Sequence, residues 1–261
     1  MSLLIVGYGK MGSALVNRWA GNTDLSISVI DPYAKIESMP LSVRLCTSLD
    51  ELHGQTFDAI VIAIKPQMIK DLLPDYLPFL ASGGCLLSIA AGFSINSLEA
   101  IAGKLPIIRM MPNLPAEIGK GVTAFYANEH AKPAHTSLAS TLTTVTGYSL
   151  EVSFEEELDK VTAVAGSGTG YGFEIIRSWM EATIQLGMDP VVARELVLAT
   201  LEGAVELAKL KSDSMEDLRE SVTSPQGTTA AGLAVLREEG AMEKLMTNTV
   251  NAAMKRAIEL R

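Results

Sequence analysis

The 261-residue chain is poor in aromatic residues, cysteine and histidine. Phe, Tyr and Trp make up 5% of it, with two cysteines and three histidines. Cys46 and Cys85 are too few for a disulfide framework and lie in apolar, strand-like runs, which favours buried thiols. His53, His130 and His135 are scattered in polar surroundings and are expected at the surface. No Cys, His or metal cluster is therefore expected.

The chain also has few cationic residues and lacks a long apolar run. Its formal net charge is -9, which argues against nucleic acid as a partner because phosphate binding needs clustered Lys and Arg. No stretch reaches the roughly 18 apolar residues of a membrane span. The N-terminus lacks a basic region followed by an apolar one. We expect a cytoplasmic protein with no membrane partner.

The first half of the chain alternates between apolar runs and helix-like stretches. Leu3–Val6 ends in glycine and is expected to be a buried strand, followed by a helix. Strands alternating with helices predict a mostly parallel sheet with both faces covered. Further strands are expected at Ser26–Ile30, Ala59–Ile64, Cys85–Ala90, Ile107–Met110 and Val122–Tyr126, and helices at Gln67–Leu80, broken near Pro74 and Pro78, and from an N-cap at Ser94 through Ala102.

From about Glu155 onward, helix patterns replace strands. Tyr171–Leu186 and Pro190–Leu210 are long and carry apolar stripes, and Met246–Ala257 repeats apolar residues at three- and four-residue spacing. This change predicts a boundary near residue 153, between an α/β domain of residues 1–153 and a helical domain of residues 154–261.

A glycine-rich turn follows the first strand, with the sequence Gly7-Tyr8-Gly9-Lys10-Met11-Gly12. Its position between a strand and a helix is typical of dinucleotide binding. Gly7 would permit the sharp turn, Gly9 would let a pyrophosphate approach, and Gly12 would let helix pack on strand. The helix N-terminus would supply N–H groups to the phosphates. The alternative is a tight turn that binds nothing.

Asp31 ends the second expected strand. An acidic residue there can accept hydrogen bonds from a ribose diol and repel a 2′-phosphate, which favours NAD over NADP. The alternative is a turn-forming Asp before Pro32. Lys35 lies close in sequence and could offset part of the charge.

Later segments, in one order along nearly the whole chain, resemble the pyrroline-5-carboxylate reductase family. They are Ile60–Gln67, Ser88-Ile89-Ala90-Ala91-Gly92, Arg109–Ala116 with Gly119–Thr123, Gly166-Ser167-Gly168 with Tyr171, and Val222–Pro225 with Gly227–Thr229 and Ala231–Leu233. The resemblance implies a Rossmann-type doubly wound, mostly parallel sheet followed by an all-α dimerisation domain.

The resemblance also implies an activity. Members reduce the cyclic imine 1-pyrroline-5-carboxylate to L-proline with a nicotinamide cofactor, the last step of proline biosynthesis. They form homodimers, and some assemble into decamers. Because the cofactor supplies the hydride, the protein mainly positions and desolvates the reactants.

The same resemblance assigns site residues. Besides the glycine-rich turn and Asp31, it places Ala63, Lys65, Pro66, Ala90, Ala91, Gly92 and Asn113 at the cofactor. Lys65-Pro66 could instead simply stop a strand. It places Glu155, Ser224, Gly227, Thr228 and Thr229 at the substrate, and Thr229 is the residue assigned to catalysis. The loop could be an ordinary helix start, and Glu155-Glu156-Glu157 could be a solvated acidic face.

The sequence departs from the family pattern at a few positions. Thr169-Gly170 replaces Pro-Ala, Leu114 replaces Thr, and Gln226 replaces the first glycine of a Gly-Gly pair. If the last position needs a positive φ, Gln226 would be strained by about 1 kcal/mol or more. Three readings follow: the pyrroline-5-carboxylate reductase, a reductase of another cyclic imino acid or keto compound, and a catalytically weak dinucleotide-binding protein.

Overall fold

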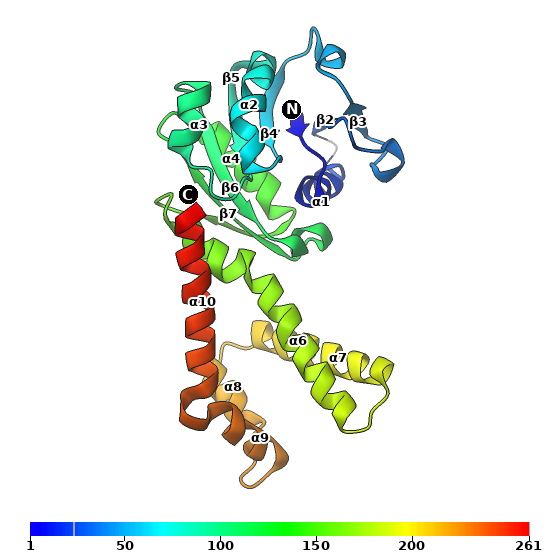
Figure 1. Ribbon diagram of the computed structural model, residues 1–261, viewed down its shortest axis with the longest axis vertical. Coiled ribbons are helices and arrows are strands. Elements are labelled where there is room, and N and C mark those ends of the chain that lie inside the picture. Colours follow the sequence, from blue (N-terminus) through cyan, green and yellow to red (C-terminus); the bar gives the residue numbers. More distant parts are fainter. Residues whose placement is uncertain (23, 261) are drawn as a thin grey trace. The chain divides into compact units, whose positions relative to one another are not determined.

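The computed structural model describes residues 1–22 and 24–260, drawn in Figure 1. They form two compact units. Unit 1 comprises Met1–Thr169 together with the residues from Ala253 onward, and unit 2 comprises Gly170–Ala252. Among the described residues, no helix is both long and apolar enough to cross a membrane.

Unit 1 is built on one eight-stranded sheet with the order β3-β2-β1-β4-β5-β6-β7-β8. Neighbouring strands pair in parallel, except that β6 and β7 are antiparallel. The chain thus winds outward from β1 in one direction and, after β3, in the other, so the order reverses between β1 and β4. The strands are β1 Ser2–Val6, β2 Ser26–Ile30, β3 Val43–Cys46, β4 Phe57–Ile62, β5 Leu80–Ser88, β6 Ile107–Pro112, β7 Gly121–Ala127 and β8 Gly147–Glu151.

Helices cover both faces of this sheet because alternate strand residues point to opposite sides. Leu3 and Ile5 pack with apolar residues of α1 and α4, whereas Leu4 and Val6 pack with those of α2 and α3. Both expectations, a parallel sheet and covered faces, are confirmed. The helices of unit 1 are α1 Lys10–Trp19, α2 Pro66–Tyr76, α3 Ile95–Ala102, α4 Pro133–Thr144 and α5 Glu157–Val161.

The expected break of the helix is found just before Pro78, but Pro74 itself does not interrupt the helix. Helix α2 continues through Pro74 to Tyr76, and a 3₁₀ turn containing Pro78 follows. Pro74 lies in the last turns of α2, where buried Leu73 and Tyr76 anchor the helix on the core. The lost N–H bond therefore does not end the helix.

Buried thiols are confirmed, and the histidines are less uniform than expected. Cys46 and Cys85 are both free and buried, and burial raises the pKa of Cys85 to about 12. His53 is exposed, but His130 and His135 are half-buried. The Nε2 atom of His135 lies 3.0 Å from the Gly83 carbonyl oxygen.

The remaining helices are α6 Gly168–Gln185, α7 Pro190–Leu210, α8 Met215–Ser221, α9 Thr228–Arg237 and α10 Ala241–Leu260. Helix α7 begins as its sequence indicates, because Asp189 caps it by accepting from the Val191 N–H at 2.8 Å and Pro190 occupies its first position.

Compact unit 1 extends past the expected boundary at residue 153. Leu158 of α5 is fully buried and packs with Met111 and Ala124 of the sheet. These apolar contacts keep the first helical residues with the α/β unit, although they follow the last strand. The chain thus changes from strands to helices after Glu151, whereas the first compact unit continues to Thr169.

Candidate dinucleotide and substrate site

Six parallel strands of unit 1, β1 to β6, end at one edge of the sheet. Val6 of β1 is in register with Ile30 of β2 and Ile62 of β4, and Ser88 of β5 is in register with Arg109 of β6. Because parallel strands share their carboxyl edge, the segments that follow them lie along that edge. The structure thereby brings together the predicted cofactor residues at Gly7–Gly12, Asp31, Ala63, Lys65, Pro66, Ala90, Ala91, Gly92 and Asn113.

The glycine-rich turn has the backbone shape that its sequence predicts. Gly7 has a φ of +100°, and a Cβ there would lie 2.8 Å from the Ala63 carbonyl oxygen. A Cβ on Gly12 would collide with the Gly7 carbonyl oxygen, so α1 packs closely against the turn. A Cβ on Gly9 would meet no atom within 4 Å. The turn is therefore tight on its protein side and open at Gly9, where α1 begins with Lys10.

Asp31 is held against this turn. Its Oδ2 accepts the Tyr8 N–H at 2.7 Å, and its Oδ1 accepts the Tyr33 N–H at 2.8 Å. The second bond closes the turn that the Asp31-Pro32 sequence predicts, so the Asp31 carboxylate stabilises the local backbone. Each carboxylate oxygen has a further lone pair, and the side chain is only half-buried. The carboxylate is thus fixed beside the glycine-rich turn with acceptor capacity remaining.

The segment after β4 both ends a strand and starts a helix. The Ala63 N–H donates to the Val6 carbonyl at 2.9 Å, which ties this segment to the end of β1. Lys65 is exposed at the N-cap of α2, and Pro66 occupies the first helical position. The strand-stop interpretation is correct for the backbone and leaves the Lys65 side chain at the carboxyl edge.

The segment after β5 turns sharply before α3. Ala90 is buried, Ala91 is exposed, and Gly92 has a φ of +72°. A Cβ on Gly92 would collide with the carbonyl oxygen of Leu260, so the end of α10 packs directly on this segment. Ser94 then caps α3 by accepting the Ser97 N–H at 3.2 Å, as its sequence predicts.

Asn113, at the end of β6, is buried and bonded within the protein. Its Oδ1 accepts the Val122 N–H at 2.8 Å, and its Nδ2 donates to the Ala165 carbonyl at 3.0 Å. Ala165 belongs to a π-helical turn, Thr162–Gly166, between α5 and α6. Asn113 therefore joins the sheet edge to the start of the Gly166-Ser167-Gly168 motif.

Glu155 does not lie on a solvated acidic face. Its Oε1 accepts from Arg109 Nη1 at 2.5 Å and from the Ile95 N–H at 2.8 Å. The Arg109 side chain is 2% exposed and that of Glu155 16% exposed. Arg109 was missed as a site residue, although one cation inside the apolar run Ile107–Met111 is a signal for a buried, paired charge.

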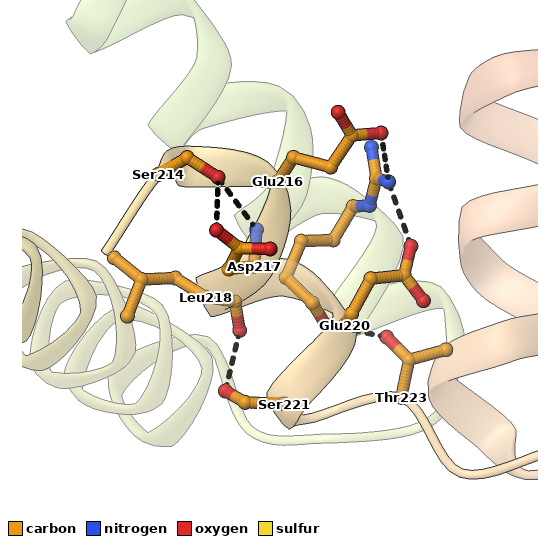
Figure 2. Close-up of polar contacts among 8 residues, drawn as sticks. Ser214, Glu216, Asp217, Leu218, Glu220, Ser221 and Thr223 are labelled. Carbon is orange, nitrogen blue, oxygen red and sulfur yellow. Dashed lines mark hydrogen bonds and ion pairs between the residues drawn. The ribbon is translucent and has the colours of Figure 1, made fainter.

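The predicted substrate loop lies in unit 2, between α8 and α9. Helix α8 is capped by Ser214, and Arg219 bridges Glu216 and Glu220 at 3.1 and 2.7 Å (Figure 2). The Thr223 hydroxyl donates to the Arg219 carbonyl at 2.6 Å and fixes the chain where the loop starts.

The loop itself confirms the backbone expectation at Gln226, which has a φ of +59°. The Gly227 N–H donates to the Ser224 carbonyl at 3.0 Å, and a Cβ on Gly227 would collide with Ser224 Oγ. Helix α9 starts at Thr228, and Thr228 and Thr229 are exposed in its first turn. The loop thus places two hydroxyl-bearing residues at a helix N-terminus.

Taken together, the order of strands and the open glycine-rich turn at the reversal point define a Rossmann-type dinucleotide-binding protein. Comparisons with known protein families identify the chain more specifically. A family model described as pyrroline-5-carboxylate reductase dimerisation matches residues 155–260, and one described as NADP oxidoreductase coenzyme F420-dependent matches residues 2–92.

Named relatives extend over nearly the whole chain. It is 32% identical to a pyrroline-5-carboxylate reductase of Pseudomonas aeruginosa, over 99% of this chain and 96% of the relative. It is 31% identical to pyrroline-5-carboxylate reductase 2 of Bacillus subtilis, over 98% and 94%. The crystal structure of the Plasmodium falciparum pyrroline carboxylate reductase with NADP bound superposes with a TM-score of 0.88 at 28% identity, covering 100% and 98%. The chain belongs to the pyrroline-5-carboxylate reductase family.

Proposed function

We propose that this protein reduces 1-pyrroline-5-carboxylate to L-proline with NAD(P)H. The observation that carries the proposal is the full-length relationship to named reductases, supported by the open glycine-rich turn at the carboxyl edge of the sheet. In this reaction a hydride passes from the reduced nicotinamide to the carbon of the C=N bond. A proton on the nitrogen completes the secondary amine.

The cofactor would lie along the carboxyl edge of unit 1. The first-turn N–H groups of α1 would face the pyrophosphate, because Gly9 leaves that approach open. Ala63, Lys65 and Pro66 would flank the phosphates or the nicotinamide ribose. Ala90, Ala91 and Gly92 would lie at the nicotinamide. Asn113 would orient it through its remaining amide proton, since the structure already uses the other amide groups.

The substrate carboxylate would bind at the start of α9. Backbone N–H groups at a helix N-terminus attract an anion, and the exposed Thr229 hydroxyl can donate a further hydrogen bond. Ser224, Gly227 and Thr228 would shape this site. Glu155 would act near the substrate through its partners, because its carboxylate is bonded to Arg109 and Ile95.

Asp31 supports a lean toward NADH. The bonds from Tyr8 and Tyr33 fix its carboxylate beside the glycine-rich turn, and the adenosine ribose of a bound dinucleotide would lie next to it there. Its free lone pairs can accept from the ribose hydroxyls, whereas its charge would repel a 2′-phosphate. The Plasmodium relative has NADP bound, so this preference would be a property of the present chain.

The helical region, residues 154–261, would form a homodimer, and the dinucleotide region would be residues 1–153. The match of residues 155–260 to a dimerisation family supports this assignment. Large apolar side chains exposed on its helices, such as Phe173 of α6 and Val205 of α7, suit a partner surface.

A second candidate is a related cyclic imino acid as substrate. Gln226 favours it, because a long amide side chain stands two residues before α9, where the family pattern has glycine. Such a side chain would reduce the space that the substrate loop leaves for the imino acid.

A turnover assay separates the candidates. NADH and NADPH oxidation would be followed with pyrroline-5-carboxylate, pyrroline-2-carboxylate and piperideine carboxylates, with proline measured as product. We expect the highest kcat/KM with pyrroline-5-carboxylate. Efficient reduction of another imine without activity on this one would replace the leading proposal. Cofactor binding without turnover of any imine would favour a catalytically weak dinucleotide-binding protein.

The carboxylate role predicts the behaviour of Thr229→Ala. Losing a hydrogen bond to a charged group costs about 1.5–3 kcal/mol, which corresponds to roughly a 10- to 100-fold rise in KM for the imino acid. KM for the cofactor should stay within about twofold. Steady-state kinetics would measure both, with Thr229→Ser as the control that keeps the hydroxyl. Equal rises in both KM values would contradict the assignment.

A further inference from the structure

Arg109 places a fully buried charge within the sheet. It lies in the middle of β6, its side chain is 2% exposed, and its Nη1 contacts Glu155 Oε1 at 2.5 Å. A buried guanidinium needs a charged partner, because an isolated buried charge is strongly destabilising. Glu155 supplies that partner from the segment before α5. The pair therefore fixes Glu155 relative to the sheet.

The same Glu155 oxygen holds the start of α3. The Ile95 N–H, the first of the helix, donates to Glu155 Oε1 at 2.8 Å. A carboxylate at this position also interacts favourably with the positive end of the helix dipole. Helix α3 is thus attached through Glu155 to Arg109.

Both ends of the segment 89–94 are linked to Arg109, one directly and one through Glu155. Ser88, the last residue of β5, is the register partner of Arg109 across the sheet. Ile95, which follows the segment, is joined to Arg109 through Glu155. Between these ends lie Ala90, Ala91 and Gly92, whose positions depend on where the segment leaves β5 and where it enters α3.

We infer that Arg109 and Glu155 are positioning residues that set the Ala90–Gly92 segment against the nicotinamide. The inference rests on the proposed function, because that function places this segment at the nicotinamide. Neither residue touches the reacting atoms in this assignment. The pair acts through Ser88 and Ile95, and hydride transfer is sensitive to such placement because it requires a short, aligned approach.

Single-turnover kinetics can separate positioning from stability. With enzyme in excess over NAD(P)H and saturating pyrroline-5-carboxylate, the loss of NAD(P)H fluorescence gives a rate constant and an amplitude. Glu155→Gln keeps the shape and the acceptor for Ile95 but removes the charge that pairs with Arg109. We expect its rate constant to fall tenfold or more, with the amplitude per folded site and the NAD(P)H Kd within twofold of wild type. Glu156→Gln, an exposed neighbour, serves as the control.

A second variant breaks only the link to α3. Ile95→Pro removes the N–H donor at the first helical position, where proline is tolerated. Ile95→Val is its matched control for lost side-chain volume. The proline variant should slow hydride transfer like Glu155→Gln, and the double variant should be little slower than either single one. A wild-type rate constant with reduced amplitude in these variants would overturn the inference and indicate a purely structural pair.

A failure of the proposed function would give a different experimental result from a failure of the positioning inference. Wild-type enzyme that does not oxidise NAD(P)H with pyrroline-5-carboxylate would refute that function. Hydrogen exchange of the 89–97 peptide then decides the positioning inference without any imine. We expect NAD(P)H to protect this peptide in the wild type and at least fivefold less in Glu155→Gln. Equal protection in both proteins would overturn the inference.

Discussion

At the residue scale, the charge and hydrogen bonds of a single side chain can have effects that no neighbouring residue provides. Asp31 shows this, because its two oxygens bond the Tyr8 and Tyr33 N–H groups and hold a negative charge beside the glycine-rich turn. A serine could take over part of the hydrogen bonding. It could not supply the negative charge that, in the proposed cofactor site, would repel a 2′-phosphate.

Asp31→Ser should therefore shift cofactor preference toward NADPH. Removing a like charge from the path of a phosphate is expected to raise the NADPH/NADH ratio of kcat/KM by about tenfold or more. Steady-state kinetics with both cofactors would measure it. Asp213→Ser, an equal change of net charge in unit 2, should leave the ratio unaltered. An unchanged ratio in Asp31→Ser would show that Asp31 does not set the cofactor preference.

Gln226 illustrates strain held by one residue. Its φ of +59° lies in a region that side chains other than glycine enter at a cost. Gln226→Gly should raise the free energy of unfolding by about 0.5 kcal/mol, after the entropy of the added glycine is subtracted. Denaturant titration would measure this. Gln226→Ala keeps the strain and should give no stabilisation; equal gains in both variants would point to the side chain rather than the backbone.

At the element scale, the sequence predicted strands and helices where the hydrophobic pattern was strong. Strand β2 and helix α7 begin and end as expected. The pattern missed β3, β8 and α4. The strands lie at or near the two sheet edges, with polar residues such as Arg44 and Ser149 between their apolar ones. Helix α4 is rich in Ser and Thr and forms because Leu138 and Leu142 pack in the core.

Helix caps are elements whose energy can be tested directly. Ser94→Ala removes the acceptor for the Ser97 N–H and should lower the free energy of unfolding by about 1 kcal/mol. Ser94→Asp retains an acceptor and should lose far less. Denaturant titration at one fixed protein concentration would compare them, because assembly shifts apparent stability. Equal losses in the two variants would show that the Ser94 bond is not the stabilising contact.

At the scale of the whole molecule, the family assignment predicts assembly. Light scattering should give twice the chain mass of 27.8 kDa, or a multiple of that. The apparent Tm should also rise with protein concentration, because dilution favours dissociation and unfolding. A monomer that retains full turnover at micromolar concentration would contradict the homodimer.

The candidate site was predictable from sequence to the extent that local motifs encode it. Glycine spacing predicted the turn at Gly7–Gly12, and the backbone bears this out. Contacts between distant segments were not predictable. Glu155 with Arg109, Asn113 with Ala165, and Gly92 with Leu260 each join residues far apart in sequence. Such pairs depend on how the helices and strands pack against one another, and this packing cannot be read from local patterns in a single sequence.

The contact of Gly92 with Leu260 has a consequence for biosynthesis. Unit 2 is inserted into the chain of unit 1, so the residues that complete unit 1 are translated after all of unit 2. The ribosome therefore releases the Ala90–Gly92 segment long before the end of α10 can pack on it. A nascent chain could form the sheet early yet lack this covering contact until synthesis passes Leu260, so the Ala90–Gly92 segment would be completed only after both units have emerged.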